Sequence, residues 1–410
     1  MITREQLAER DAGDVLAAVR ERFFIPTGIV YLDGNSLGPM PRAVPAHVRE
    51  IIETQWGEDL ITSWNRHDWV NMPLRLGDKL APLLGAAPGQ VAIADSTSVN
   101  LFKVLSAALA MRAGRSVVLS EAGNFPTDLY VARGLTAHCD CTLKLTADGE
   151  DVAAALDEDT AVLLLTQVDF RSGAMHDIAR VSKAAHAVGA LVIWDLAHSA
   201  GAVPLQLDAW QVDLAIGCGY KYLNGGPGAP AFVYVNQALQ ARFQPLLQGW
   251  FAHARPFDFD PDFHAADGIR RALCGTPPVL SMAALEVGLD TFAGVDMAQV
   301  REKSLALSDV FMQVLQQECG DCGMQIISPR EPDKRGSQVA VKHPHAYAAM
   351  QALIERGVIG DFRSPDIMRF GFGPLYIRFV DVWDAVAALR DVFTAHSYAD
   401  PKYGVRAKVT

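Results

Sequence analysis

The residues best suited to covalent chemistry are a lysine and an aspartate near the middle of the chain. Lys221 lies in the run Cys-Gly-Tyr-Lys-Tyr-Leu-Asn-Gly-Gly-Pro-Gly, residues 218–228, where glycines let backbone and a flat ligand approach closely. Asp195 follows the apolar residues 190–194, and a buried carboxylate there needs a cationic partner. An amine for an aldehyde and an acid for a pyridine nitrogen are what a pyridoxal 5'-phosphate (PLP) site requires.

Three further segments could complete such a site. Ser96–Ser98 precede a predicted helix, and hydroxyls with free N–H groups at a helix start bind phosphate. Phe125 opens the run Phe-Pro-Thr-Asp and could stack on a flat ring. Arg369 could hold a substrate carboxylate through two parallel hydrogen bonds. Each group also has a plain structural explanation: a lysine in a surface hairpin, an aspartate or serine that caps a helix, and an arginine in a surface ion pair.

The elements that would position these residues alternate between strands and helices. Apolar strands are predicted at residues 90–94, 116–120, 141–145, 161–167, 190–194, 214–218 and 232–235, with helices between them, such as 99–111 and 177–188. This alternation predicts an α/β fold whose mostly parallel mixed sheet is flanked by helices on both faces. Ligands of such sheets bind at the carboxyl ends of the strands, and Asp195, Thr166 and Lys221 fall just beyond strand ends.

The pattern changes after about residue 278. A long helical region at 280–317 precedes strands near 324–327, 338–341, 358 and 367–370 and helices at 346–356 and 383–396, and residues 400–410 read as a loose tail. We therefore predict a large domain at residues 49–290 and a small C-terminal α+β domain at residues 291–410.

The composition narrows the classes of partner. The 410 residues carry a net charge of -11, and half of them are hydrophobic, which fits a globular enzyme and disfavours nucleic acid or an anionic membrane as a partner. Neither a signal peptide nor an apolar run long enough to span a membrane is present in the sequence, so we expect a cytoplasmic protein. Cys319 and Cys322 have the spacing of a metal or redox pair, but without a second pair we expect free thiols and no metal.

The motifs Asp195-Leu-Ala-His198, Gly219-Tyr-Lys-Tyr-Leu-Asn224 and Phe125-Pro-Thr-Asp128 together resemble the kynureninase family, in its bacterial form. These are PLP-dependent transferase-fold enzymes of fold type I, the aspartate aminotransferase type. Tyr31–Gly38, Gly249–Phe251, Gly275–Pro278 and Gly373–Tyr376 agree with the family as well. The resemblance runs from about residue 25 to 390. It implies a hydrolase that cleaves the Cβ–Cγ bond of L-kynurenine to anthranilate and L-alanine in tryptophan degradation, and a homodimer with active sites at the subunit interface. It also implies that residues 1–48 pack with the small domain and line the active site, and that the large domain, residues 49–290, binds PLP.

The resemblance also implies roles for individual residues. As catalytic groups, Lys221 would carry the cofactor and shuttle protons, Asp195 would hold the pyridine nitrogen, and Tyr220 would act as a proton donor. The other cofactor-binding residues would be Thr97, Ser98, Phe125, Pro126, Thr127, Asp128, Thr166, His198, Trp250 and Thr276, with Trp250 and Thr276 reaching the phosphate from the partner subunit. The substrate-binding residues would be Arg369, for the α-carboxylate, with Asn35, Ser36 and Trp64.

Two departures and two rival interpretations remain. Thr276 stands where some members of the family have asparagine, and residues 63–67 differ from the form in the animal enzymes, which favours L-kynurenine over 3-hydroxy-L-kynurenine. A cysteine desulfurase or selenocysteine lyase would have the same fold, but it usually has histidine where Tyr220 precedes Lys221. A non-catalytic PLP-binding protein usually carries a basic DNA-binding domain, for which no block of clustered Arg and Lys is present.

Overall fold

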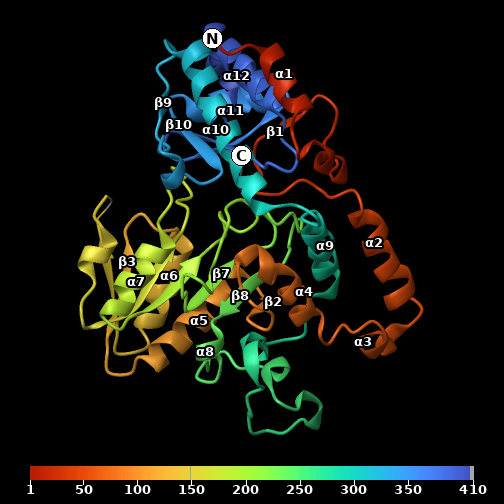
Figure 1. The fold of residues 1–410 in the computed structure, drawn as a ribbon, viewed down its shortest axis with the longest axis vertical. Helices are drawn as coiled ribbons and strands as arrows, with labels where there is room; N and C mark the ends of the chain where they lie inside the picture. Colours follow the sequence, from red (N-terminus) through yellow and green to blue (C-terminus); the bar gives the residue numbers. More distant parts are fainter. Residues whose placement is uncertain (148, 407–410) are drawn as a thin grey trace.

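A seven-stranded sheet forms the largest element of the protein, seen here in a computed structural model that describes residues 1–147 and 149–406. Its strand order is β2-β8-β7-β6-β5-β3-β4 (Figure 1). The strands are β2 (Val91–Ala94), β3 (Val117–Glu121), β4 (Thr142–Thr146), β5 (Thr160–Thr166), β6 (Leu191–Asp195), β7 (Leu214–Gly217) and β8 (Ala231–Val235). β4, β3, β5, β6 and β7 are parallel neighbours, whereas β8 is antiparallel to both β7 and β2. The predicted mostly parallel mixed sheet is confirmed.

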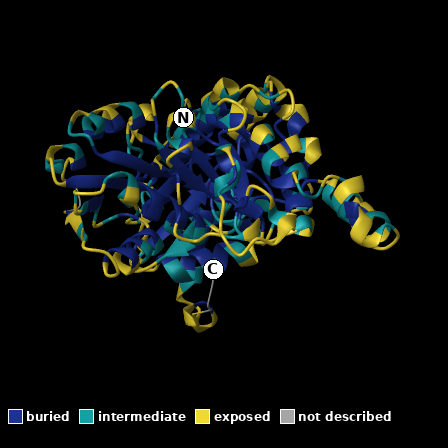
Figure 2. Ribbon diagram, turned by 90° about the horizontal axis from the view of Figure 1, so that it is seen from below, coloured by how far each residue is buried: buried dark blue, intermediate teal, exposed yellow. Residues whose placement is uncertain are grey.

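Helices cover both faces of this sheet because its strands are apolar on both sides. Along β5, Val162 and Leu164 pack in one core with α5 (Thr97–Met111) and α6 (Pro126–Thr136), while Leu163 and Leu165 pack in a second core with α7 (Ile178–Ala187). This alternation is the period of two that a strand imposes on its side chains. Figure 2 shows the consequence, with buried strands in dark blue between helices whose outer surfaces are exposed.

A second, four-stranded sheet lies above the first in Figure 1 and comes from the C-terminal part of the chain. Its order is β12-β13-β10-β9, and every neighbouring pair is antiparallel. The strands are β9 (Gln325–Ile326), β10 (Gln338–Lys342), β12 (Asp361–Arg363) and β13 (Ile367–Gly371), and the helices near them are α10 (Met297–Cys319), α11 (Ala346–Glu355) and α12 (Phe379–Thr394).

The N-terminal residues join this second unit. Helix α1 (Arg4–Ala12) packs on α12, and β1 (Val30–Tyr31) pairs in parallel with β11 (Val358–Ile359). Before the first strand of the large sheet, the chain forms α2 (Val44–Glu50), the π-helix η2 (Ile51–Trp56), α3 (Ser63–Arg66) and α4 (Met72–Leu80). α2 has no buried residue, and α2 with η2 forms an arm at the right of Figures 1 and 2.

Two expectations about the C-terminal part were wrong. The helical region predicted at residues 280–317 is two helices, α9 (Val279–Asp290) and α10, because Gly294 adopts a positive φ of 72° and Asp296 caps the start of α10. The predicted loose tail contains the short 3-10 helix Pro401–Gly404, whose Tyr403 is buried and donates to Glu355. Residues 407–410 of that tail lie outside the described residues. Within the part of the chain that the structure describes, no helix is both long and apolar enough to cross a membrane.

Candidate active site

A cavity of about 310 Å³ opens at the carboxyl edge of the large sheet, a volume in the range of small-molecule sites. It is lined by Ser96, Thr97, Ser98, Phe125, Thr127, Asp128, Thr166, Phe170, Asp195, Ala197, His198, Tyr220, Lys221, Ala229 and Ala231. The sheet topology explains this convergence. β2, β3, β5, β6 and β7 all end at this edge, and the antiparallel β8 begins there.

Lys221 and His198 touch within this cavity. Lys221 Nζ lies 2.8 Å from His198 Nε2, and His198 Nδ1 lies 3.1 Å from Gln338 Oε1. Burial of the ring, followed by the nearby charges of Lys221 and Arg369, holds the pKa of His198 well below its usual range. A neutral imidazole can accept a hydrogen bond from the lysine at one nitrogen while it donates at the other.

Asp195 and Asp128 form a buried carboxyl pair. The main-chain N–H of Ala197 donates to Asp195 at 2.8 Å, and the side chains of the two acids are hydrogen-bonded to each other. Burial, followed by the charge of Asp195, raises the pKa of Asp128 well above its usual range, and burial also raises the pKa of Asp195. One proton shared between the two acids relieves their repulsion. A cation placed beside Asp195 would relieve it as well.

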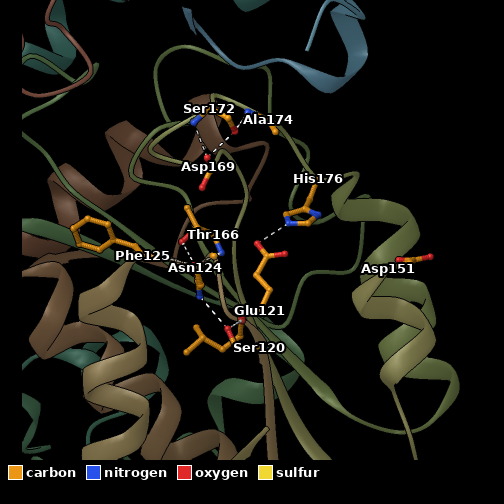
Figure 3. Close-up of polar contacts among 12 residues, drawn as sticks. Ser120, Glu121, Asn124, Phe125, Asp151, Thr166, Asp169, Ser172, Ala174 and His176 are labelled. Atoms are coloured by element: carbon orange, nitrogen blue, oxygen red, sulfur yellow. Dashed lines mark hydrogen bonds and ion pairs between the residues drawn. The ribbon is translucent and has the colours of Figure 1, made fainter. Parts of the chain in front are cut away.

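Asn124 ties the strand ends together beneath Phe125 (Figure 3). Its Oδ1 accepts from Thr166 Oγ1 at 2.5 Å and from the main-chain N–H of Phe125 at 2.8 Å, and its Nδ2 donates to Ser120 at 3.1 Å. The Phe125 ring meets the ring of Phe170 edge to face, with 5.2 Å between centroids. Asn124 therefore fixes both an aromatic wall of the cavity and the hydroxyl of Thr166.

The start of α5 forms another wall of the cavity. The helix begins at Thr97, two residues earlier than predicted, because Ser96 caps it by accepting from the N–H of Val99. Thr97 and Ser98 therefore lie in the first turn, whose N–H groups have no partner within the helix. Ser96 is thus a helix cap, and Thr97 and Ser98 line the cavity. Phosphate binding by this turn stays a prediction.

Tyr220 lines the cavity beside Lys221 and is half-buried. Burial, followed by the neighbouring Cys218 thiol and the Asp195 carboxylate, raises the pKa of its phenol well above the usual value. The phenol therefore keeps its proton throughout the neutral pH range.

Arg369 on β13 is almost wholly buried, in an ion pair rather than at the surface. Its Nε donates to Asp361 Oδ1 at 2.7 Å, and its Nη2 makes a second bond to the same carboxylate. Nη1 donates to the carbonyl of Phe170, and Nη2 also lies 3.3 Å from Ser36 Oγ. Asp361 thus occupies the two parallel N–H groups that were expected to bind a substrate carboxylate. Arg369 does not itself line the cavity, but its Nη1 bonds to Phe170, which does.

The remaining predicted site residues do not line the cavity of this chain. Asn35 is fully buried near Gly371, and within residues 1–147 and 149–406 its amide has no hydrogen-bond partner. Trp64 and Trp250 both pack on Phe251, and Trp250 remains 39% exposed. Pro126, at the first turn of α6, and Thr276 are also exposed.

Neither a metal site nor a disulfide is present in the described part of the chain. It holds no group of three or more His, Cys, Asp or Glu side chains arranged to hold a metal ion. All six cysteines are free thiols, including Cys319 and Cys322. Cys274, the cysteine that a desulfurase interpretation would use, is partly buried and does not line the cavity.

Comparison with solved structures defines the class of the fold. The chain superposes on a cysteine desulfurase from Thermococcus onnurineus NA1 with a TM-score of 0.77 at 16% identity, covering 92% of this chain and 98% of the other. A cysteine desulfurase from Escherichia coli gives 0.75 at 20% identity, with coverage of 93% and 98%. A mutant of C-DES, with glycine covalently linked to its PLP cofactor, gives 0.79 at 17% identity, with coverage of 91% and 99%. The architecture is that of the fold type I PLP-dependent enzymes.

Comparison of sequences places the chain within that class. It is 51% identical to the kynureninase of Burkholderia pseudomallei (strain 1106a) and 49% identical to that of Pseudomonas fluorescens, in both cases over the full length of both proteins. The profile of the kynureninase C-terminal domain matches residues 300–389. This chain belongs to the kynureninase family.

Three residues of the site were not singled out from the sequence. Asn124 directly precedes the Phe-Pro-Thr-Asp run, so a longer reading of that motif could have included it. Phe170 follows β5 by four residues, a position typical of a cavity wall. Gln338 comes from the second sheet, more than a hundred residues from His198, and no local signal indicates it.

Proposed function

We propose that this protein is a kynureninase, a PLP-dependent hydrolase that converts L-kynurenine and water into anthranilate and L-alanine. The observation that carries the proposal is the convergence of Lys221, Asp195 and His198 on one cavity in a chain half identical to kynureninases. The expected preference for L-kynurenine over its 3-hydroxy form is part of the same proposal.

The cavity fits PLP at three points. Lys221 acts on the carboxyl pair of Asp195 and Asp128 through its charge, but among the described residues no cationic side chain is hydrogen-bonded to either acid. A protonated pyridine nitrogen would stabilise the pair. The first turn of α5 offers N–H groups and the hydroxyls of Thr97 and Ser98 to a phosphate. The Lys221 amine lines the same cavity and could bond the aldehyde. PLP, when bound, supplies a ring that withdraws electrons from the substrate's α-carbon.

The side chains of this protein would then divide the work. Lys221 would take the proton from the α-carbon, and Arg369 would orient the α-carboxylate through its Nη1 end. Water adds to the γ-carbonyl, and the Cβ–Cγ bond breaks to release anthranilate. Tyr220 holds a proton that it could deliver to Cβ, which becomes the methyl carbon of L-alanine.

A homodimer is part of this proposal. Trp250 and Thr276 are exposed and do not line the cavity, as expected for residues that serve the partner's site. The arm formed by α2 and η2 exposes Ile52 and Trp56, and Leu280 of α9 is exposed beside it. Such a surface favours burial against a second copy. A cytoplasmic location is proposed from the six free thiols, which suit a reducing compartment.

The test is an assay of the purified protein supplied with PLP. Anthranilate fluorescence should rise with L-kynurenine. 3-Hydroxyanthranilate, followed by its absorbance, should form more slowly from 3-hydroxy-L-kynurenine. The Lys221→Ala variant should lose both this activity and the visible absorption of the lysine-bound cofactor. Sulfide release from cysteine without anthranilate release would replace the proposal with a desulfurase, and a colourless protein in the presence of PLP would reject both.

A further inference from the structure

Gln338 connects the second sheet to the cavity. It is 1% exposed at the start of β10, and its side-chain Oε1 lies 3.1 Å from His198 Nδ1. Its Nε2 donates to the main-chain carbonyls of Phe170 at 3.1 Å and Asp169 at 3.4 Å. His198 in turn touches Lys221, so one chain of contacts runs from β10 to the lysine.

These contacts fix the orientation of the amide. Carbonyl oxygens can only accept, so the NH₂ group of Gln338 must face Phe170 and Asp169. The amide oxygen must therefore face His198, and an oxygen there accepts only from a protonated Nδ1. A flipped amide would set oxygen against two carbonyls and leave buried donors and acceptors mismatched.

The orientation of the amide decides what His198 presents to Lys221. In a neutral ring with the proton on Nδ1, the lone pair of Nε2 points at the lysine amine. Lys221, Arg369 and Arg363 are the charged groups that act on His198, and all three are cationic. Their charges, together with burial, oppose a second proton on the ring, so Nε2 stays an acceptor.

We propose that Gln338 is a positioning residue that holds His198 in the Nδ1–H tautomer, so that Nε2 accepts a hydrogen bond from Lys221. The inference rests on the proposed role of Lys221 as the proton-transferring amine. A residue of the second sheet would then set the direction of proton transfer at Lys221. Without Gln338, His198 reverts to the Nε2–H form that free histidine prefers, and two donors then face each other.

The first test needs neither cofactor nor substrate. In cofactor-free protein labelled with ¹⁵N-histidine, the His198 signals are assigned by their loss in His198→Gln. The wild type should show a protonated Nδ1 and an unprotonated Nε2 at pH 7.5, and Gln338→Met should show the reverse. Gln338→Glu keeps an acceptor oxygen and should keep the Nδ1–H form, while its negative charge raises the pKa of His198.

The second test uses the PLP-loaded enzyme. Gln338→Met should lower kcat about tenfold, the size expected for one lost hydrogen bond, with KM little changed and with a shifted pH dependence of the cofactor's visible absorption. Gln240→Met is the matched control, because the Gln240 amide is also buried and also donates to two main-chain carbonyls, those of Gly89 and Val235. Gln240→Met should change neither kcat nor the pH dependence of the cofactor's absorption.

The outcomes separate this inference from the proposed function. A protonated Nε2 in the wild type, or an unchanged tautomer in Gln338→Met, would overturn the role of Gln338 even in an active kynureninase. Equal losses in Gln338→Met and Gln240→Met would reduce Gln338 to a packing residue. A tautomer switch in a protein without activity on L-kynurenine would keep the positioning role and reject the proposed function.

Discussion

At the scale of single residues, the carboxyl pair of Asp128 and Asp195 controls the charge of the cavity. Burial, followed by the charge of Asp195, raises the pKa of Asp128 well above its usual range. Of the two acids, Asp128 therefore binds a proton more tightly and is the one placed to donate a hydrogen bond to Asp195. With that proton bound, the pair would carry one negative charge instead of two, on the acid proposed to face the pyridine nitrogen.

Two substitutions of Asp128 test this assignment. Asp128→Asn preserves a neutral donor to Asp195, so the affinity for PLP should change by less than about threefold. Asp128→Ala removes the donor and leaves Asp195 without that partner, so the affinity should fall about tenfold or more. Titration of the cofactor-free protein with PLP, followed by absorbance, measures both. Equal losses would mean that Asp128 acts as an ionised group.

The residues predicted from sequence and those missed differ in where their signal lies. Lys221, Asp195 and Phe125 sit in short motifs that carry their own glycines, apolar strands or helix starts, so local sequence indicates them. Gln338 acquires its role only through contacts between the two sheets. Arg369 was singled out from the sequence, but its ion pair with Asp361 was not predicted. That pair results from the register of β12 and β13, which places the two residues opposite each other, and local sequence does not reveal a register.

At the scale of elements, α4 lies unusually close to β2. A Cβ built on Gly77 of α4 would sit 2.0 Å from the main-chain oxygen of Val91, so only glycine allows this approach. β2 leads directly into Ser96, the residue before α5. The packing of α4 on β2 therefore helps to position the start of α5. The close contact thus helps to place the proposed phosphate-binding turn.

Gly77→Ala should destabilise the protein by about 2 kcal/mol or more, because the backbone of α4 or β2 must shift. Gly134→Ala in α6 is the matched control. There a Cβ would meet nothing within 4 Å, and alanine in a helix is favoured over glycine by about 0.5–1 kcal/mol. Thermal melting of the two variants should show opposite shifts. Similar melting temperatures would show that α4 can move away from β2 without loss.

The contact between the N-terminal loop and the second sheet should make the stability of the protein depend on pH. Asp33 faces Asp361 in a network with Ser36 and Arg369, and its Oδ1 is shielded from solvent. Burial, followed by the charge of Asp361, raises the pKa of Asp33 from 3.8 to about 7. The folded state therefore binds a proton more tightly than the unfolded state, and stability falls as the pH rises from about 4 through 7.

Asp33→Asn should remove this part of the pH dependence, because the amide stays neutral. The melting temperature of the wild type should drop between pH 6 and pH 8 by on the order of 2 °C more than that of the variant. Asp384→Asn, at an exposed ion pair with Arg4, should leave the wild-type slope intact. A steeper slope in Asp33→Asn than in the wild type would contradict the assignment.

The boundaries of helices and strands could be predicted where the hydrophobic periodicity and the capping residues indicated the same end. The strands at the site were found within one or two residues, because uninterrupted Val, Ile and Leu runs are typical of buried parallel strands. The break between α9 and α10 was missed, since the residues around Gly294 continue a helical composition while one positive φ interrupts it. The burial of Tyr403 depends on Glu355, a partner no local pattern reveals.

At the scale of the whole molecule, we propose that residues 1–48, 49–290 and 291–410 act as three units. Helix α1 packs on α12 of the C-terminal unit, and Ser36 donates to Asp361 at 2.7 Å, so the first segment joins the C-terminal sheet. Its next helices form the exposed arm against α9. A single monomer would leave the apolar side chains of that arm in water.

Leu280→Arg tests whether this face pairs with a second copy. Leu280 is 40% exposed on α9, so the folded monomer should tolerate the charge. Sedimentation should show a dimer in the wild type and a monomer in the variant, with the affinity for PLP reduced about tenfold, because Trp250 and Thr276 of the partner would be lost. Leu145→Arg, on the edge strand β4 at the opposite end of the sheet from β2, should remain dimeric. A dimeric Leu280→Arg variant would place the interface elsewhere.

The carbonyl of Phe170 receives two donors, Gln338 from β10 and Arg369 from β13. These strands are hydrogen-bonded neighbours, so the two donors are held in a fixed register on one sheet. A displacement of that sheet away from Phe170 would break both hydrogen bonds. It would release the Gln338 amide that contacts His198 as well as the Arg369 guanidinium.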